Sequence, residues 1–111
     1  MFVDGFSADT VACEEGVLRK VLAWNGDLMM CEISFQAGAK GKVHAHVHTQ
    51  VSYVGRGSFR FRVGDETKVV RQGDSILIPP NTLHGVEALE EAMLVDVFSP
   101  ARQDFVQGAL M

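Results

Sequence analysis

Four side chains, grouped at two places in the sequence, could together bind a divalent metal ion. His44, His46 and Gln50 lie within one short segment, and His84 lies in a second segment further along the chain. Imidazole is the commonest nitrogen ligand of protein-bound metals, and an amide oxygen suits the harder divalent ions. If these groups converge in the fold, the protein is a metalloprotein and its chemistry is expected at the ion.

The spacing of these residues places a condition on the fold. Residues two apart in an extended strand point to the same face, so His44 and His46 are predicted to project together. A straight strand would carry Gln50 about 13 Å beyond His46 at ~3.3 Å per residue, so the chain must turn back after Val47. His84 is distant in sequence, and closure of a barrel is expected to bring it near. The alternative is that these are unconnected surface or core residues.

Length, charge and cysteine content limit the class of protein. The chain has 111 residues, of which 47% are hydrophobic, which predicts one domain with a real core. A net charge of −4 offers no basic surface for a nucleic acid. Cys13 and Cys31 have no paired spacing, which fits a reducing cytoplasm. The first residues resemble no signal peptide, and no apolar run approaches the roughly 18 residues that span a bilayer. We expect a cytoplasmic protein with no membrane contact.

Short runs of β-prone residues, separated by turn residues, predict an all-β fold for residues 1–111 as a single domain. In one run, Phe59 and Phe61 alternate with polar residues, as in a strand with one buried face. Asn25–Gly26 predicts a type I′ hairpin turn. Many short strands with regular turns are typical of a sandwich or barrel. The predicted strands are Val17–Trp24, Leu28–Phe35, Val51–Val54, Ser58–Val63, Thr67–Val70, Ile76–Ile78, Val86–Leu89 and Met93–Phe98.

The two ends of the chain carry weaker patterns. Pro100 is expected to end the last strand, and residues 101–111 could form a short helical turn. Phe2, Val3 and Phe6 could add an edge strand that pairs with a second subunit.

The two metal-binding segments resemble the paired motifs of the cupin superfamily. Residues 38–57 follow the first motif, with Gln50 where the family carries Glu. Residues 73–88 resemble the second motif, with Asn81 in place of Gly and Ala88 in place of Asn. Asn is an acceptable replacement for Gly because it also tolerates the left-handed conformation. The resemblance implies a cupin double-stranded β-helix, or jelly-roll barrel, with the ion inside.

The neutral Gln50 favours one kind of metal chemistry over another. Three neutral imidazoles and an amide leave the full +2 charge on the ion, which makes it a stronger Lewis acid toward an anion. The same set is less suited to stabilising Fe(III), so it favours binding of a carboxylate or enolate over oxygenase chemistry. The ligand set admits Zn, Ni, Mn, Co or Fe.

Five further stretches along the chain, which begin at Arg19, Leu28, His44, Ile78 and Asp96, resemble one small cupin family, that of the pectin degradation protein KdgF. The resemblance implies a cytoplasmic, homodimeric enzyme that opens 4,5-unsaturated monouronates, from pectin or alginate, to the linear 5-keto-4-deoxyuronate. It also implies active-site roles for Asp96, Phe98 and Arg102.

Each of these three residues also has a simpler interpretation. Alternation places Asp96 on one face with Leu94 and Phe98, where a carboxylate is costly unless it has a partner, and this favours a pocket over a strand edge. On periodicity alone, Phe98 is more typical of the core than of a substrate platform. Arg102, after Pro100, could hold a substrate carboxylate or lie free at the surface.

Other residues near the motifs receive minor roles. His48 breaks the cupin spacing and is interpreted as lining the pocket, while Tyr53 and Gln36 could reach it. Cys31 is expected to be a small buried hydrophobe. Core filling is expected of the methionines at Met29, Met30 and Met93.

Two other functions fit the same motifs. One is a metal-dependent dioxygenase cupin acting on a flavonoid or diketone, which the neutral Gln50 disfavours. The other is a sugar-acid-binding barrel without catalysis.

Overall fold

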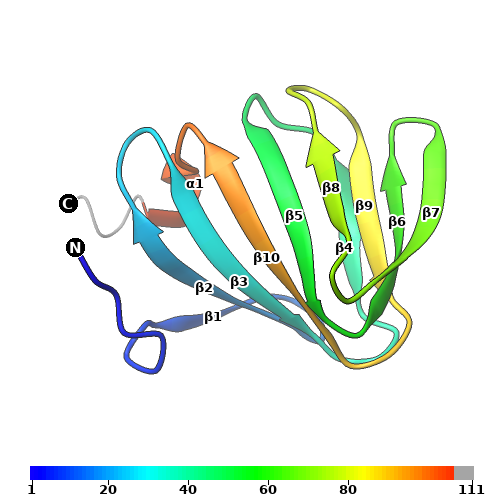
Figure 1. Ribbon diagram of the computed structural model, residues 1–111, viewed down its shortest axis with the longest axis horizontal. Helices are drawn as coiled ribbons and strands as arrows, with labels where there is room; N and C mark the ends of the chain where they lie inside the picture. The colour runs from blue at the N-terminus through cyan, green and yellow to red at the C-terminus, as the bar shows by residue number, and fades with distance from the viewer. Residues whose placement is uncertain (107–111) are drawn as a thin grey trace.

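The structure, a computed structural model, describes residues 1–106 as two antiparallel β-sheets packed face to face (Figure 1). The six-stranded sheet has the order β1-β2-β3-β10-β5-β8, and the four-stranded sheet has the order β4-β9-β6-β7. The strands are β1 (Thr10–Glu14), β2 (Val17–Trp24), β3 (Met29–Phe35), β4 (Lys40–His44), β5 (Thr49–Arg56), β6 (Ser58–Val63), β7 (Glu66–Arg71), β8 (Ser75–Ile78), β9 (His84–Ala88) and β10 (Ala92–Ser99), followed by the helix α1 (Gln103–Val106).

The core lies between the two sheets and follows from period-two alternation in the strands. In β3, the residues at positions 29, 31, 33 and 35 are buried, and those between them are less buried or exposed. β10 shows the same pattern from Ala92 to Phe98. Phe35 and Phe59 meet across the sandwich with their rings edge to face, 5.1 Å between centroids. Cys31 is fully buried, as expected, and is among the residues that fill this core.

The eight predicted strands are confirmed, and two observed strands, β1 and β4, are not among them. β2 and β6 have the predicted bounds, and the other predicted runs differ from the observed strands by one or two residues at their ends. β1 was not predicted because all five of its residues are exposed, so it has no alternating pattern. Within the single chain, Phe2, Val3 and Phe6 form no strand and both phenylalanines are fully exposed, so the edge strand that would pair with a second subunit stays a prediction.

The predicted turn between β2 and β3 has the right place and the wrong geometry. Trp24 pairs with Met29, so the loop has four residues, and neither Asn25 nor Gly26 has the positive φ of a type I′ turn. Instead, the Asn25 side-chain oxygen accepts hydrogen bonds from the backbone N–H groups of Asp27 and Leu28 (2.9 and 3.0 Å). An Asn side chain that bonds to the following backbone favours this wider loop over the tight one.

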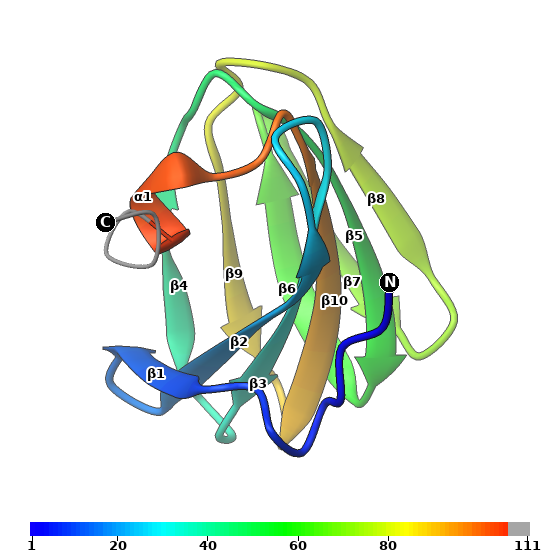
Figure 2. The same cartoon turned by 90° about the vertical axis from the view of Figure 1, so that its left-hand side faces the viewer.

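The C-terminal end of the described chain lies at one side of the sandwich. α1 follows β10 and lies on the side where β2 and β4 diverge (Figure 2). It confirms the predicted helical turn over residues 103–106, while residues 107–111 of that prediction lie outside the described part. A single turn of helix cannot cross a membrane, and residues 1–106 contain no other helix.

Candidate metal centre and active site

Three imidazoles converge near the end of the four-stranded sheet. His44 is the last residue of β4, His84 is the first residue of β9, and the two are direct cross-strand partners. The expectation that barrel closure would bring His84 near is therefore wrong, because pairing within one sheet does so. His46 lies in the loop after β4, and the ligand atoms of the three histidines lie within 4.8 Å of one another. They could hold a metal ion.

The chain turns back after His46, as the spacing required. Residues 47 and 48 form a bend, so that β5 begins at Thr49 and Gln50 faces the histidines. The loop after β8 supports this bend, since the backbone N–H of Asn81 donates to the carbonyl oxygen of His46 at 2.7 Å. Asn81 has a φ of 59°, which confirms the left-handed conformation expected where the family carries Gly.

Backbone hydrogen bonds set the tautomers of two histidines. Nδ1 of His44 lies 2.8 Å from the carbonyl oxygen of Lys42, and Nδ1 of His84 lies 2.9 Å from that of Thr82. A carbonyl oxygen only accepts, so each Nδ1 carries the proton and each Nε2 keeps a free lone pair. Nε2 of His84 is buried without a hydrogen-bond partner, which is costly unless a cation occupies the space beside it.

A chain of hydrogen bonds fixes the orientation of Gln50. Its Nε2 donates to Oγ of Ser52 at 3.0 Å, and this hydroxyl donates to Oδ1 of Asp96 at 2.6 Å. Oε1 of Gln50 is thereby directed at the imidazoles, 3.0 Å from Nε2 of His46. Two ligand atoms bound about 2.1 Å from one ion at a right angle would be roughly 3.0 Å apart. The donor set therefore fits one divalent ion.

Burial keeps two of these imidazoles neutral. It lowers the pKa of His46 to about 4, with a further contribution from the positive charge of Arg102, and it also lowers the pKa of His84. A histidine must be unprotonated to bind a metal, so both side chains are in the required state at neutral pH.

Asp96 is a buried carboxyl group directly behind Gln50 and Ser52. Burial raises its pKa to about 6, and the hydrogen bonds from Ser52 and Gln50 and the charge of Arg102 oppose this rise. The alternation argument for Asp96 is confirmed, since its side chain points inward with Leu94 and Phe98. A carboxyl group with a pKa near neutrality can both take up and release a proton under ordinary conditions.

His44, Gln50, His84 and Asp96 line a cavity of about 520 Å³, a volume typical of small-molecule sites. Phe98 is almost fully buried in its wall, with its ring centroid 5.8 Å from that of His46. The cavity residues that matter for the chemistry are His44, Gln50, His84, Asp96, Phe98, Arg102, Arg19 and Phe105.

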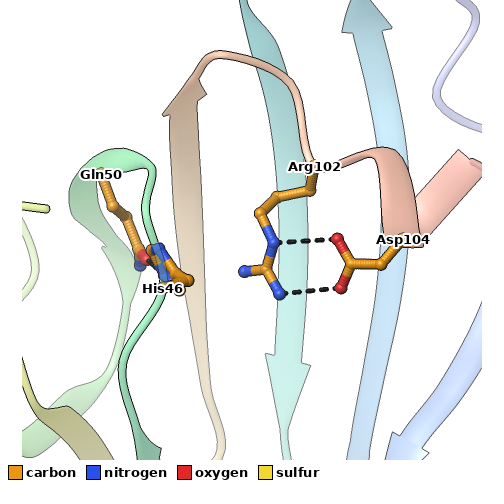
Figure 3. Close-up of polar contacts among 4 residues, drawn as sticks. All are labelled: His46, Gln50, Arg102 and Asp104. Carbon is orange, nitrogen blue, oxygen red and sulfur yellow. Dashed lines mark hydrogen bonds and ion pairs between the residues drawn. The ribbon is translucent and has the colours of Figure 1, made fainter. Parts of the chain in front are cut away.

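Arg102 lies at the cavity and is held in place by a neighbouring carboxylate. Its Nε and one terminal nitrogen donate to the two oxygens of Asp104 at 3.1 and 2.9 Å, while its third nitrogen points toward His46 and Gln50 (Figure 3). Its guanidinium carbon lies 5.2 Å from the centroid of the Phe98 ring. Of its two predicted roles, free surface cation and pocket residue, the geometry favours the second.

The residues given minor roles lie in varied places. His48 lies beside His46, with 5.2 Å between ring centroids, and is not part of the convergent cluster. The expectation that Tyr53 could reach the pocket is wrong, because its side chain is exposed on the outer face of β5. Gln36 lines a separate depression. Met29 is core, as expected, but Met30 is exposed and Met93 only partly buried.

The sequence interpretation missed Ser52, Arg19, Asp104 and Phe105. Ser52 lies two residues after Gln50, so strand alternation places both on one face. Arg19 stands between Val17 and Val21, a charged residue on an otherwise apolar strand face. Both signals were available in the sequence. The other two depend on the turn of α1, which no pattern fixed.

Comparison with known proteins agrees with this geometry. Residues 31–98 match the cupin domain family. The pectin degradation protein KdgF of Dickeya dadantii (strain 3937) is 42% identical over 94 residues, which cover 83% of this chain and 86% of that protein. The chain is a cupin of the KdgF family.

Two solved structures support the same assignment of this cupin. An RmlC-like cupin from Shewanella frigidimarina NCIMB 400 is 43% identical, with a TM-score of 0.91 over 95% of both chains. KdgF from Halomonas sp. is 36% identical, with a TM-score of 0.90 over 95% of this chain and 97% of the other. The predicted jelly-roll fold is confirmed.

Proposed function

We propose that this cupin catalyses the metal-dependent opening of 4,5-unsaturated monouronates to the linear 5-keto-4-deoxyuronate. Its similarity to a pectin degradation protein supports the substrate class. The observation that carries the proposed chemistry is that Oε1 of Gln50 lies 3.0 Å from Nε2 of His46, while the amide nitrogen of Gln50 is joined by hydrogen bonds through Ser52 to Asp96, which makes one continuous row. This row joins a cluster able to hold a cation to a carboxyl group poised to exchange a proton.

The reaction requires one proton to leave an oxygen and one to arrive at a carbon. The substrate is a cyclic enol ether with a hemiacetal hydroxyl at C1 and a carboxylate at C5. Loss of the C1 hydroxyl proton forms the C1 carbonyl and breaks the bond from C1 to the ring oxygen. The electron pair remains on that oxygen as an enolate of C4 and C5. Protonation at C4 then gives the 5-keto product.

Asp96 is suited to both proton transfers. As a carboxylate it takes the C1 hydroxyl proton, and as the acid it delivers this proton to C4, so it returns to its starting state. A pKa near 6 allows both steps near neutral pH. Ser52 donates to Oδ1 of Asp96, and Asp96 lines the cavity that would receive the substrate.

His44, His46, Gln50 and His84 are proposed to hold a single divalent ion. Such an ion, when bound, supplies Lewis-acid stabilisation of negative charge on the substrate. The third nitrogen of Arg102 is available to a carboxylate, because Asp104 occupies the other two. Phe98 forms an apolar part of the cavity wall, and its ring packs beside that of His46.

The function is tested with freshly generated unsaturated galacturonate and the metal-loaded protein. We expect the enol-ether absorbance to fall faster than in buffer, and a chelator to remove the acceleration. A rate equal to that in buffer would refute the proposal. Binding without acceleration would then indicate a sugar-acid-binding barrel, and oxygen uptake with an aromatic diketone would indicate a dioxygenase.

We also propose that the protein is a cytoplasmic homodimer. Two free cysteines, Cys13 and Cys31, support a reducing compartment. The outer face of the six-stranded sheet exposes large apolar side chains on β3, β5 and β8, and a second copy of the same face could cover them. These side chains are Met30, Val51, Tyr53 and Leu77, which are 41 to 62% exposed.

Light scattering after size-exclusion chromatography tests the dimer. We expect Val51→Lys to give monomers and the wild type to give dimers. Val69→Lys serves as the control, because Val69 is equally exposed (43%) but lies on β7 of the other sheet. A monomeric wild type would refute the proposal.

A further inference from the structure

Arg19 is a second cation in the wall of the cavity. It lies on β2 between Val17 and Val21, on the inward face of the strand, and its cross-strand partner on β3 is Ile33. Its side chain lines the same cavity as His44, Asp96 and Arg102. An arginine on an apolar strand face requires an explanation, since apolar neighbours do not compensate for the free-energy cost of removing its guanidinium group from water.

Stacking on an aromatic ring holds the Arg19 side chain in place. Its guanidinium carbon lies 3.7 Å from the centroid of the Phe105 ring, and that of Arg102 lies 4.3 Å from the same centroid. A cation over an aromatic face is attracted by the ring, and the planar guanidinium can stack there while its N–H edge stays free. The ring of Phe105 thus contacts both guanidinium groups.

The two arginines differ in how their charge is compensated. Arg102 forms an ion pair with Asp104. Arg19 forms no ion pair with any carboxylate of residues 1–106, and its Nε is buried without a hydrogen-bond acceptor. Glu14, at the rim of the cavity, instead accepts from the backbone N–H of Lys42. A buried, unpaired guanidinium donor in a cavity wall is complementary to an anionic ligand.

We propose that Arg19 binds the carboxylate of the sugar-acid substrate and determines the preference for an acid over a neutral sugar. This inference rests on the proposed function, since it assigns the residue that recognises the substrate in the same cavity. Asp104 leaves Arg102 one free nitrogen, whereas Arg19 can offer a carboxylate two parallel N–H donors, a geometry that a Lys cannot reproduce.

The test compares an acid substrate with its neutral methyl ester in two variants. With the acid, Arg19→Gln is expected to raise KM about ten- to a hundredfold, the usual effect of losing a charged hydrogen bond, while kcat changes little. With the methyl ester, wild type and Arg19→Gln are expected to have the same KM. Lys20→Gln is the control, because Lys20 is adjacent in sequence and its Nζ donates to the backbone oxygen of Gly5 outside the cavity. Lys20→Gln should change neither the KM for the acid nor the KM for the methyl ester.

Two outcomes would overturn the role of Arg19. One is an unchanged KM for the acid in Arg19→Gln. The other is an equal rise in KM for the acid and for the methyl ester, which a merely structural role would produce. Should Arg19→Gln not fold, Arg19→Lys keeps the charge and the aliphatic stem. This variant is expected to raise the KM for the acid by a smaller factor and to leave the KM for the methyl ester unchanged.

Calorimetric binding of saturated galacturonate separates this inference from the proposed function. If the wild type binds galacturonate, Arg19→Gln binds it at least tenfold more weakly, and neither turns over the unsaturated sugar, the carboxylate-binding role of Arg19 is supported and the proposed ring opening is refuted. Turnover by the wild type with equal galacturonate affinity in both proteins would refute Arg19 alone. A wild type that neither binds nor turns over would refute both.

Discussion

Replacement of Asp96 by Asn is expected to stabilise the protein while removing its activity. Burial raises the pKa of Asp96 from its ordinary value of 3.8 to about 6. This rise corresponds to about 3 kcal/mol of folding free energy lost once the carboxyl group ionises. An Asn side chain can still accept from Ser52, but its amide N–H group lacks a partner, which costs about 1–2 kcal/mol. The expected net gain is about 1–2 kcal/mol.

The gain must depend on pH in a defined direction. The raised pKa means that the folded state holds the Asp96 proton more tightly than the unfolded state. The stability that this proton contributes is present below pH 4 and is lost as the pH rises to about 6. Asp96→Asn should therefore be less stable than the wild type by about 1 kcal/mol at pH 4, where only the cost of its unpaired amide remains, and more stable than the wild type above pH 6. The lowered pKa of His46 has the opposite effect in both proteins, and it cancels in the difference.

Urea denaturation of the metal-free proteins at pH 4 and pH 8 measures this difference. Turnover of the metal-loaded variant should fall by about 10²- to 10⁴-fold with metal content unchanged, as loss of an acid–base group predicts. Asp65→Asn, in the exposed turn after β6, serves as the control and should change neither quantity. A variant less stable than the wild type at pH 8, or a difference independent of pH, would refute the assignment.

Two further substitutions probe the site and the fold. Gln50→Glu removes the donor to Ser52 and adds a negative charge near Asp96, so it should raise the pKa of Asp96 further. The acidic limb of the pH–rate profile should then move to higher pH, and an unmoved profile would contradict this. Gly57→Ala should destabilise the protein more than Gly73→Ala by about 2 kcal/mol or more in thermal denaturation. Both glycines have positive φ, but an added Cβ at Gly57 would lie 2.7 Å from the backbone oxygen of Glu91, whereas at Gly73 it meets open space; equal losses would contradict a steric cause.

The sequence predicts the strands because half-buried strands leave a period-two pattern. Phe59 and Phe61 on β6 are buried, as their alternation indicated. β1 has no buried face, because it lies at the edge of the sheet, and a fully exposed strand has no alternation to detect. The apolar residues Phe2 and Phe6 suggested a strand that the single chain does not form. Hydrophobicity without alternation was a poor guide there.

The sequence predicts the imidazole cluster better than it predicts the path that assembles it. The spacing of His44, His46 and Gln50 required a reversal of the chain, and the bend at residues 47 and 48 supplies it. Spacing alone cannot show which strands are neighbours, so the direct pairing of His44 with His84 was not foreseen. Arg19 was overlooked because its role depends on a ring from α1, more than 80 positions away in the sequence.

The most direct test of the metal centre is the metal content of untagged protein, measured by elemental analysis. The wild type is expected to carry about one divalent ion per chain, and His84→Ala should carry almost none. His48→Ala should retain the ion, because His48 lies beside the cluster without belonging to it. A wild type free of metal after exposure to all candidate ions, or an equal loss in both variants, would contradict a centre built from these four side chains.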